Sequence, residues 1–142
     1  MDEIWYTDSI EGIDWAALKR VLQEDDFDNG RSPAQYELLA RNSAVNIFAF
    51  AHTDAGDGLI GNLRVLSDGV CNAYMVDVWT HSAYRRMGIA RHMIDLAVEK
   101  LPGQHLYLFT DDQPAFYAAV GFTPRGVGME KPVGQWLVNS WE

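Results

Sequence analysis

The sequence is poor in cysteine and in basic residues, and each shortage excludes a class of protein. Cys71 is the only cysteine among 142 residues, so the chain can form no intrachain disulfide and no zinc site built from several thiolates. Eleven lysines and arginines stand against 20 acidic residues, which gives a formal charge of −9. A nucleic-acid reader needs a surplus of cations. We therefore expect no metal and no nucleic-acid partner.

Long hydrophobic runs are also lacking. The N-terminus reads Met1-Asp2-Glu3, acidic where a secretory signal would be basic. The best apolar run, residues 44–51, is interrupted by Asn46 and is too short to cross a bilayer. These features predict a reduced, cytoplasmic protein with no membrane partner.

What the chain does contain is an ordinary globular composition, 48% hydrophobic and 22% charged. Its length is enough to bury a core, and no stretch is polar enough to serve as a linker. We expect residues 1–142 to form a single domain.

Two helices and four strands are expected before residue 81. Residues 4–7 favour a short strand, and Asp14 can cap a helix over 15–23. Ser32, Pro33 and Gln35 form a capping-box pattern that opens a second helix. Three strand-like runs follow at 45–52, 59–66 and 72–80, and the turns at 54–58 and 67–69 join them as an antiparallel meander.

The second half changes to a strand–helix–strand pattern. A helix is expected over 88–101, stopped by Pro102-Gly103, and a buried strand over 105–110. This unit makes strands 72–80 and 105–110 parallel. A short helix at 114–120 and a last strand near 128–132 complete the prediction. The fold class is mixed α+β, with helices on both faces of a mixed sheet.

The segment Tyr84–Ala90 lies between a strand and a helix, where a phosphate can bind. The first turn of a helix has unpartnered N–H groups and a positive dipole end, and Gly88 and Ala90 leave room beside it. Arg85, Arg86 and Arg91 add positive charge. An ordinary helix start with surface arginines is the alternative interpretation.

Arg85-x-x-Gly88-x-Ala90 after a strand resembles the Q/R-x-x-G-x-G/A acyl-CoA signature of the GNAT superfamily of N-acetyltransferases. The order of elements is similar too, and so are the downstream pairs Phe116-Tyr117 and Gly121-Phe122. The resemblance covers residues 3 to 132. Ala90 stands where glycine is usual, the chain after Gly121 has little room for the usual final hairpin, and the tail after residue 134 has no counterpart.

The resemblance implies that acetyl-CoA is the co-substrate and that its acetyl group passes directly to an amine. The pantetheine arm would lie between strands 72–80 and 105–110, with a backbone N–H near Val78 polarising the thioester carbonyl. The pyrophosphate would bind the backbone from Arg86 to Arg91. The implied cofactor-binding residues are Val78, Trp79, Thr80, Arg85, Arg86, Met87, Gly88, Ile89, Ala90 and Arg91.

Two residues are candidates for catalysis. The resemblance implies that Tyr117 protonates the departing CoA thiolate, and a core aromatic is the alternative. Asp77 is a lone carboxylate inside an apolar strand, so it is a base, a ligand of the amine, or a structural aspartate at a bulge. Residues 76–78 also resemble the arylalkylamine-type plant and cyanobacterial members, which points weakly to aromatic amines. His52 and His81 could relay protons.

The acceptor is the least predictable part. The resemblance puts its pocket among the first two helices, their loop and the strand at 72–80. The loop at 24–28 is acidic, which suits either a cationic amine or a solvated loop. The function expected is N-acetylation of a primary amine, either of a small molecule or of a lysine or N-terminus of a protein. A non-catalytic acyl-CoA-binding regulatory module is the alternative, and a toxin acting on aminoacyl-tRNA is disfavoured by the acidity. Trp136 and Trp141, in the tail 133–142, could contribute to a homodimer contact.

Overall fold

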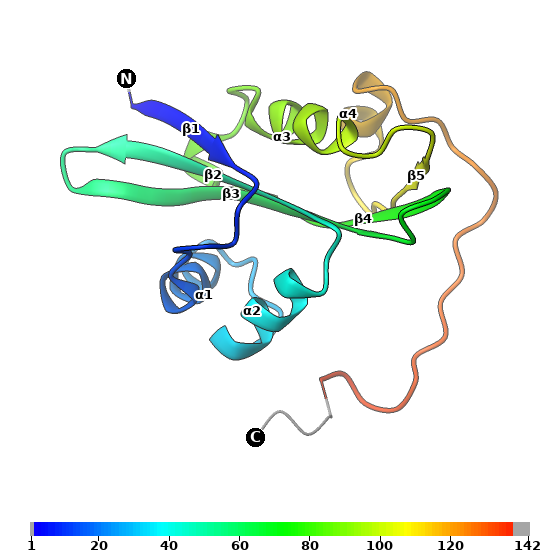
Figure 1. Cartoon of the computed structure of the whole chain (residues 1–142), viewed down its shortest axis with the longest axis horizontal. Helices are drawn as coiled ribbons and strands as arrows, with labels where there is room; N and C mark the ends of the chain where they lie inside the picture. Colours follow the sequence, from blue (N-terminus) through cyan, green and yellow to red (C-terminus); the bar gives the residue numbers. More distant parts are fainter. Residues whose placement is uncertain (1, 138–142) are drawn as a thin grey trace. The chain divides into compact units, whose positions relative to one another are not determined.

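Five strands form one mixed sheet in the order β1-β2-β3-β4-β5 (Figure 1). This computed structural model describes residues 2–137, which separate into a unit ending at Tyr107 and a unit beginning at Leu108. The expectation of a single domain therefore stays a prediction. The sheet lies wholly in the first unit, with β1 (Glu3–Thr7), β2 (Val45–Thr53), β3 (Gly56–Ser67), β4 (Asn72–Thr80) and β5 (His105–Tyr107).

The pairing of the strands confirms the predicted meander and the parallel crossover. β1 to β4 pair antiparallel in chain order, and β5 lies parallel to β4. Two predicted boundaries are wrong. The turn at 54–58 is only Asp54-Ala55, because Thr53 and Gly56 already pair. The strand at 105–110 ends at Tyr107 and is not buried, since His105 and Tyr107 are exposed at the sheet edge.

Helices cover both faces of the sheet, as predicted (Figure 1). α1 (Trp15–Glu24) and α2 (Pro33–Arg41) lie on one face, and α3 (Ile89–Val98) lies on the other. The predicted caps are confirmed: Asp14 accepts the Ala17 N–H at 3.0 Å, and Ser32 closes a capping box. α3 ends three residues before the predicted Leu101.

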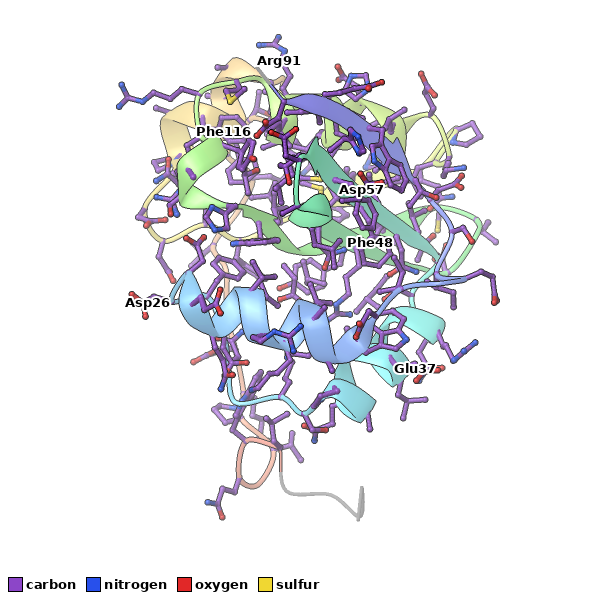
Figure 2. The ribbon with its side chains drawn as sticks, turned by 90° about the vertical axis from the view of Figure 1, so that its left-hand side faces the viewer. Asp26, Glu37, Phe48, Asp57, Arg91 and Phe116 are labelled. Atoms are coloured by element: carbon purple, nitrogen blue, oxygen red, sulfur yellow. The ribbon has the colours of Figure 1, made fainter. Side chains whose placement is uncertain are left out.

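The core has one layer on each side of the sheet. Residues 45–49 of β2 are all buried, which is typical of a central strand covered on both faces. In Figure 2, Phe48 lies beside the sheet on the side of α1, and its ring meets Trp15 edge-on. Leu18, Leu22, Tyr36 and Trp79 form the cluster beneath α1 and α2. The opposite layer contains the buried α3 residues Ile89, Met93, Ile94 and Ala97.

Within residues 108–137, the second unit contains one helix, α4 (Pro114–Ala119), close to the predicted bounds. The strand expected near 128–132 is wrong, because those residues pair with no strand of the chain between residues 2 and 137. Pro132 has no N–H to donate to a neighbouring strand. Trp141 falls outside the described residues. Within residues 2–137, no helix has the length and apolarity needed to span a bilayer.

Candidate active site

A β-bulge interrupts β4 at Asp77. The register with β3 passes from the pair Arg64–Val76 to the pair Asn62–Trp79, so Asp77 and Val78 together lie opposite Leu63. Asp77 has φ of 58°, in the left-handed region that few non-glycine residues adopt. Such a bulge bends the strand and takes backbone groups out of the regular ladder.

Two arginines hold the Asp77 carboxylate. Arg31 Nη1 donates to Oδ2 at 2.8 Å and Nη2 to Oδ1 at 3.4 Å, and Arg64 Nε donates to the same Oδ2 at 2.7 Å. All three side chains are largely buried. Burial would raise the pKa of Asp77, but the hydrogen bonds and positive charges of the arginines outweigh it and lower that pKa. Asp77 is therefore ionised at neutral pH.

A second carboxylate, Asp25 at the end of α1, binds the next part of β4. It accepts the indole N–H of Trp79 at 2.9 Å and the backbone N–H of Ser82 at 3.1 Å. Burial would raise the pKa of Asp25, and the hydrogen bonds from Ser82 and Trp79 lower it overall. The loop between α1 and α2 is thus joined to β4 at both of its ends, through Asp25 and Arg31.

A small open hollow, whose interior has room for about one water molecule, lies between this loop, α2 and the sheet. Its lining is mainly apolar and aromatic, with a few polar side chains near the bulge. The lining residues are Leu22, Phe27, Asn29, Arg31, Tyr36, Leu39, Asn62, Asp77 and Trp79. Part of the acidic loop is structural, because Asp25 binds β4 and Asp28 binds Lys19 at 2.7 Å. Asp26 extends away from the end of α1 and is exposed (Figure 2).

The edge of β4 that faces β5 is open beyond its first residues. β5 pairs only with residues 72–74, and no other strand of the described chain pairs with that edge. Thr80 Oγ1 is buried and has no hydrogen-bond partner among residues 2–137. An extended chain with amide groups, as in pantetheine, would find free backbone groups along this edge.

The N-terminus of α3 receives no side-chain cap from the described part of the chain. Gly88 is its N-cap residue and has φ of 77°, a conformation suited to glycine. No side chain among residues 2–137 caps this end, and the first helical bond is from the His92 N–H to the Gly88 carbonyl. The N–H groups of Ile89, Ala90 and Arg91 therefore remain available to an anion.

Positive charge surrounds this helix end. Arg85, Arg86 and Arg91 are all exposed, and Figure 2 shows Arg91 extending outward from the sheet. Arg86 has φ of 65°, so two left-handed residues, Arg86 and Gly88, shape the loop before the helix. Uncapped N–H groups beside three arginines fit a pyrophosphate. The residues present therefore fit acetyl-CoA at both its pantetheine and its pyrophosphate.

The remaining predicted cofactor residues differ in whether their side chains are exposed to a ligand. Trp79 and Ile89 have buried side chains, each 2% exposed, so only their backbone groups could face a ligand. Met87 is exposed beside the uncapped helix end.

His81, one of the two histidines predicted as possible proton relays, has a structural contact. Its Nδ1 accepts the Ala83 N–H at 3.0 Å and caps the short helical turn η1 (Ser82–Tyr84).

Tyr117 lies in α4 of the second unit. Its ring packs edge-on against Phe116 and Phe122, and the Phe122 N–H donates to the Tyr117 carbonyl at 2.9 Å. Burial, with a smaller effect of the Asp112 charge, raises the pKa of Tyr117. The phenol is therefore protonated at neutral pH. His52, on β2, is paired with Asp57 at an exposed hairpin.

The sequence did not predict that Arg31 and Arg64 bind Asp77, or that Asp25 joins the end of α1 to Trp79. Arg31 and Asp77 are separated by 46 residues, and Asp25 and Trp79 by 54. The one signal in the sequence was Asp77 itself, because a carboxylate in an apolar strand needs a partner. No cluster of three metal-ligating side chains occurs in the part of the chain that the structure describes.

Solved structures of acetyltransferases share this fold. A provisionally named acetyltransferase from Deinococcus radiodurans R1 is 22% identical, with a TM-score of 0.75 over 90% of this chain and 87% of that one. A GNAT family acetyltransferase from Streptococcus pneumoniae TIGR4 is 20% identical, with a TM-score of 0.72 over 95% and 100%. Glucosamine-6-phosphate N-acetyltransferase from Arabidopsis thaliana is 8% identical, with a TM-score of 0.65 over 92% and 98%.

The sequence comparisons agree with the fold. No curated protein matches this sequence. The sequence model of the Acetyltransferase (GNAT) family matches residues 13–125, which include the bulge, the uncapped helix and Tyr117. With most of the chain matched, the chain belongs to the GNAT family of acetyltransferases.

Proposed function

We propose that this acetyltransferase transfers the acetyl group of acetyl-CoA directly to a primary amine. The observation that carries the proposal is the uncapped, arginine-flanked N-terminus of α3, which follows a bulged strand with an open edge. These two features would hold the pantetheine arm and the pyrophosphate of one CoA molecule. The predicted cofactor residues of β4 (Val78–Thr80) and of the loop and first turn of α3 (Arg85–Arg91) contribute through their backbone, and the three arginines also contribute their charge.

In the proposed reaction, the amine nitrogen attacks the thioester carbonyl while the backbone near Val78 stabilises the oxygen. A C–N bond forms, the C–S bond breaks, and the amine proton passes to solvent. Tyr117, whose raised pKa keeps the phenol protonated at neutral pH, gives its proton to the CoA thiolate and regains one from solvent. That contact is part of the proposal. Binding both substrates makes the attack effectively unimolecular.

The hollow beside the bulge is the proposed acceptor site, because it borders Asp77 and Trp79 and has an aromatic lining. Of the roles open to Asp77, we favour a structural one. Two guanidiniums bind its carboxylate, and its lowered pKa makes it a weak base. The acceptor is a small molecule or the amine of a peptide.

The test is thiol release from acetyl-CoA in the presence of an amine panel, together with thermal melting with and without acetyl-CoA. We expect a rise in Tm with acetyl-CoA and thiol release with at least one amine. A rise in Tm with no thiol release against any small or peptide amine would favour an acyl-CoA-binding regulator. No rise in Tm would contradict both functions.

A further inference from the structure

The bulge at Asp77 needs an external anchor. Asp77 adopts a left-handed conformation within a strand, which persists only where the surroundings determine it. Its carboxylate binds a guanidinium fork through both oxygens and a second guanidinium through Oδ2. Because the aspartate side chain is short, fixing the carboxylate in this way restricts the backbone that bears it.

The main anchor, Arg31, is itself held in place. It directly precedes Ser32, the N-cap residue of α2, whose capping box fixes the start of that helix. The Arg31 guanidinium lies over the Tyr36 ring at 5.7 Å from its centroid. Arg31 is 8% exposed. A lysine could keep the charge at this place but not the planar, two-point contact.

Val78 lies between two residues that the α1–α2 loop holds. Asp77, before it, is bound by Arg31, and Trp79, after it, is bound by Asp25. The same loop contributes Phe27, Asn29 and Arg31 to the wall of the hollow. The position of the Val78 backbone and the position of that wall are therefore set by one segment.

We propose that Arg31 is a positioning residue: through Asp77, and together with Arg64, it fixes the Val78 backbone N–H against the thioester carbonyl. This inference rests on the proposed function. It adds that the loop which borders the acceptor hollow also places the acetyl group for attack. Arg31 acts through Asp77 and touches neither the thioester nor the proton.

The first test needs no acceptor. ¹⁵N-labelled wild-type protein, Arg31→Lys and the control Arg41→Lys are titrated with acetyl-CoA, and the amide signals of Val78 and Ala90 are followed. Arg41 is a suitable control because its ion pair with Glu37 lies on the exposed side of α2. These two amides report on the thioester end and on the pyrophosphate end of the ligand.

In wild type and Arg41→Lys, we expect both amides to shift. In Arg31→Lys, we expect the Ala90 amide signal to report a Kd for acetyl-CoA within about threefold of wild type. The chemical-shift change of the Val78 amide should fall to less than about half of its wild-type value, because loss of the anchor changes the position of the Val78 backbone rather than the affinity for acetyl-CoA. A wild-type Val78 response in Arg31→Lys would overturn the inference. Failure of both amides to respond in wild type would instead contradict the proposed function.

The second test uses an amine that the panel identifies. In Arg31→Lys we expect kcat to fall by about tenfold or more, with the KM for acetyl-CoA within about threefold, because the interaction lost acts in the transition state. Arg31→Met, which also removes the charge, should lower kcat further. An unchanged kcat in folded Arg31→Lys, or equal losses in kcat and in acetyl-CoA affinity, would contradict a positioning role. If Arg31→Met does not fold, Arg31→Lys decides the question alone.

Discussion

The conformation of Gly88 allows a sharp test of the pyrophosphate site. Gly88 has φ of 77° and no atom within 4 Å of the place where a Cβ would lie, so Gly88→Ala introduces backbone strain without a steric clash. The left-handed conformation costs an alanine about 1–2 kcal/mol relative to the right-handed one. That free energy must appear either as lost stability or as lost affinity.

Whether the cost of Gly88→Ala appears as lost stability or as lost affinity for acetyl-CoA depends on whether the loop before α3 relaxes. If the loop keeps its shape, the free energy of unfolding falls by about 1–2 kcal/mol, which for a chain of this size lowers Tm by about 3–7 °C. If the loop relaxes, acetyl-CoA must restore the original shape, and its Kd rises roughly 5- to 30-fold. The sum of the two losses should be near 1–2 kcal/mol.

Gly103 provides a matched control. Its φ of 76° and its open surroundings are close to those of Gly88, but it lies in the loop after α3, at the opposite end of that helix. Gly103→Ala should therefore lose stability and keep the wild-type Kd. The measurements are thermal melting and calorimetric titration with acetyl-CoA. Equal Kd values for Gly88→Ala and wild type, with no loss of stability in Gly88→Ala, would refute this prediction.

Three further predictions concern Tyr117, Asp77 and the core. Tyr117→Phe should lower kcat at least about tenfold and leave the acetyl-CoA Kd within about twofold, as expected for a lost proton donor; full activity would remove Tyr117 from the mechanism. The lowered pKa of Asp77 means that its contribution to stability is present above about pH 4 and is lost as pH falls through the folded value, so Asp77→Asn should flatten the decrease in Tm between about pH 5 and pH 3. An unchanged pH profile would contradict the ion cluster. Leu63→Ala, at a side chain that is 0% exposed, should cost about 3 kcal/mol in urea unfolding, and a loss below about 1 kcal/mol would contradict its burial.

Local signals made much of the fold predictable. Asp14 and Ser32 define helix starts through bonds to residues three positions away, and the sequence contains both partners of each bond. The signature at 85–90 was recognisable because strand, loop and helix are contiguous there. These features depend on neighbours in the chain, so a single sequence is sufficient to predict them.

The parts that were missed depend on distant partners. Asp77 was noticed as an isolated carboxylate, but its bonds to Arg31 and Arg64 depend on the pairing of β3 with β4 and on the packing of α2. The length of β5 depends on β4 in the same way. Pairing ends at Tyr74, shortly before the bulge, and a bulge bends its strand away from the neighbour. Residues 108–110 are apolar enough for a strand but do not pair with β4.

The proposed activity of this protein is the transfer of an acetyl group from acetyl-CoA to an amine. The most direct measurement is to incubate the wild-type protein with acetyl-CoA and each amine of the panel, then to quantify free CoA thiol and the acetylated amine by mass spectrometry. We predict that, with at least one amine, the two products form in equal amounts, and that both depend on Tyr117. Binding of acetyl-CoA with neither product, against every small and peptide amine, would contradict the claim.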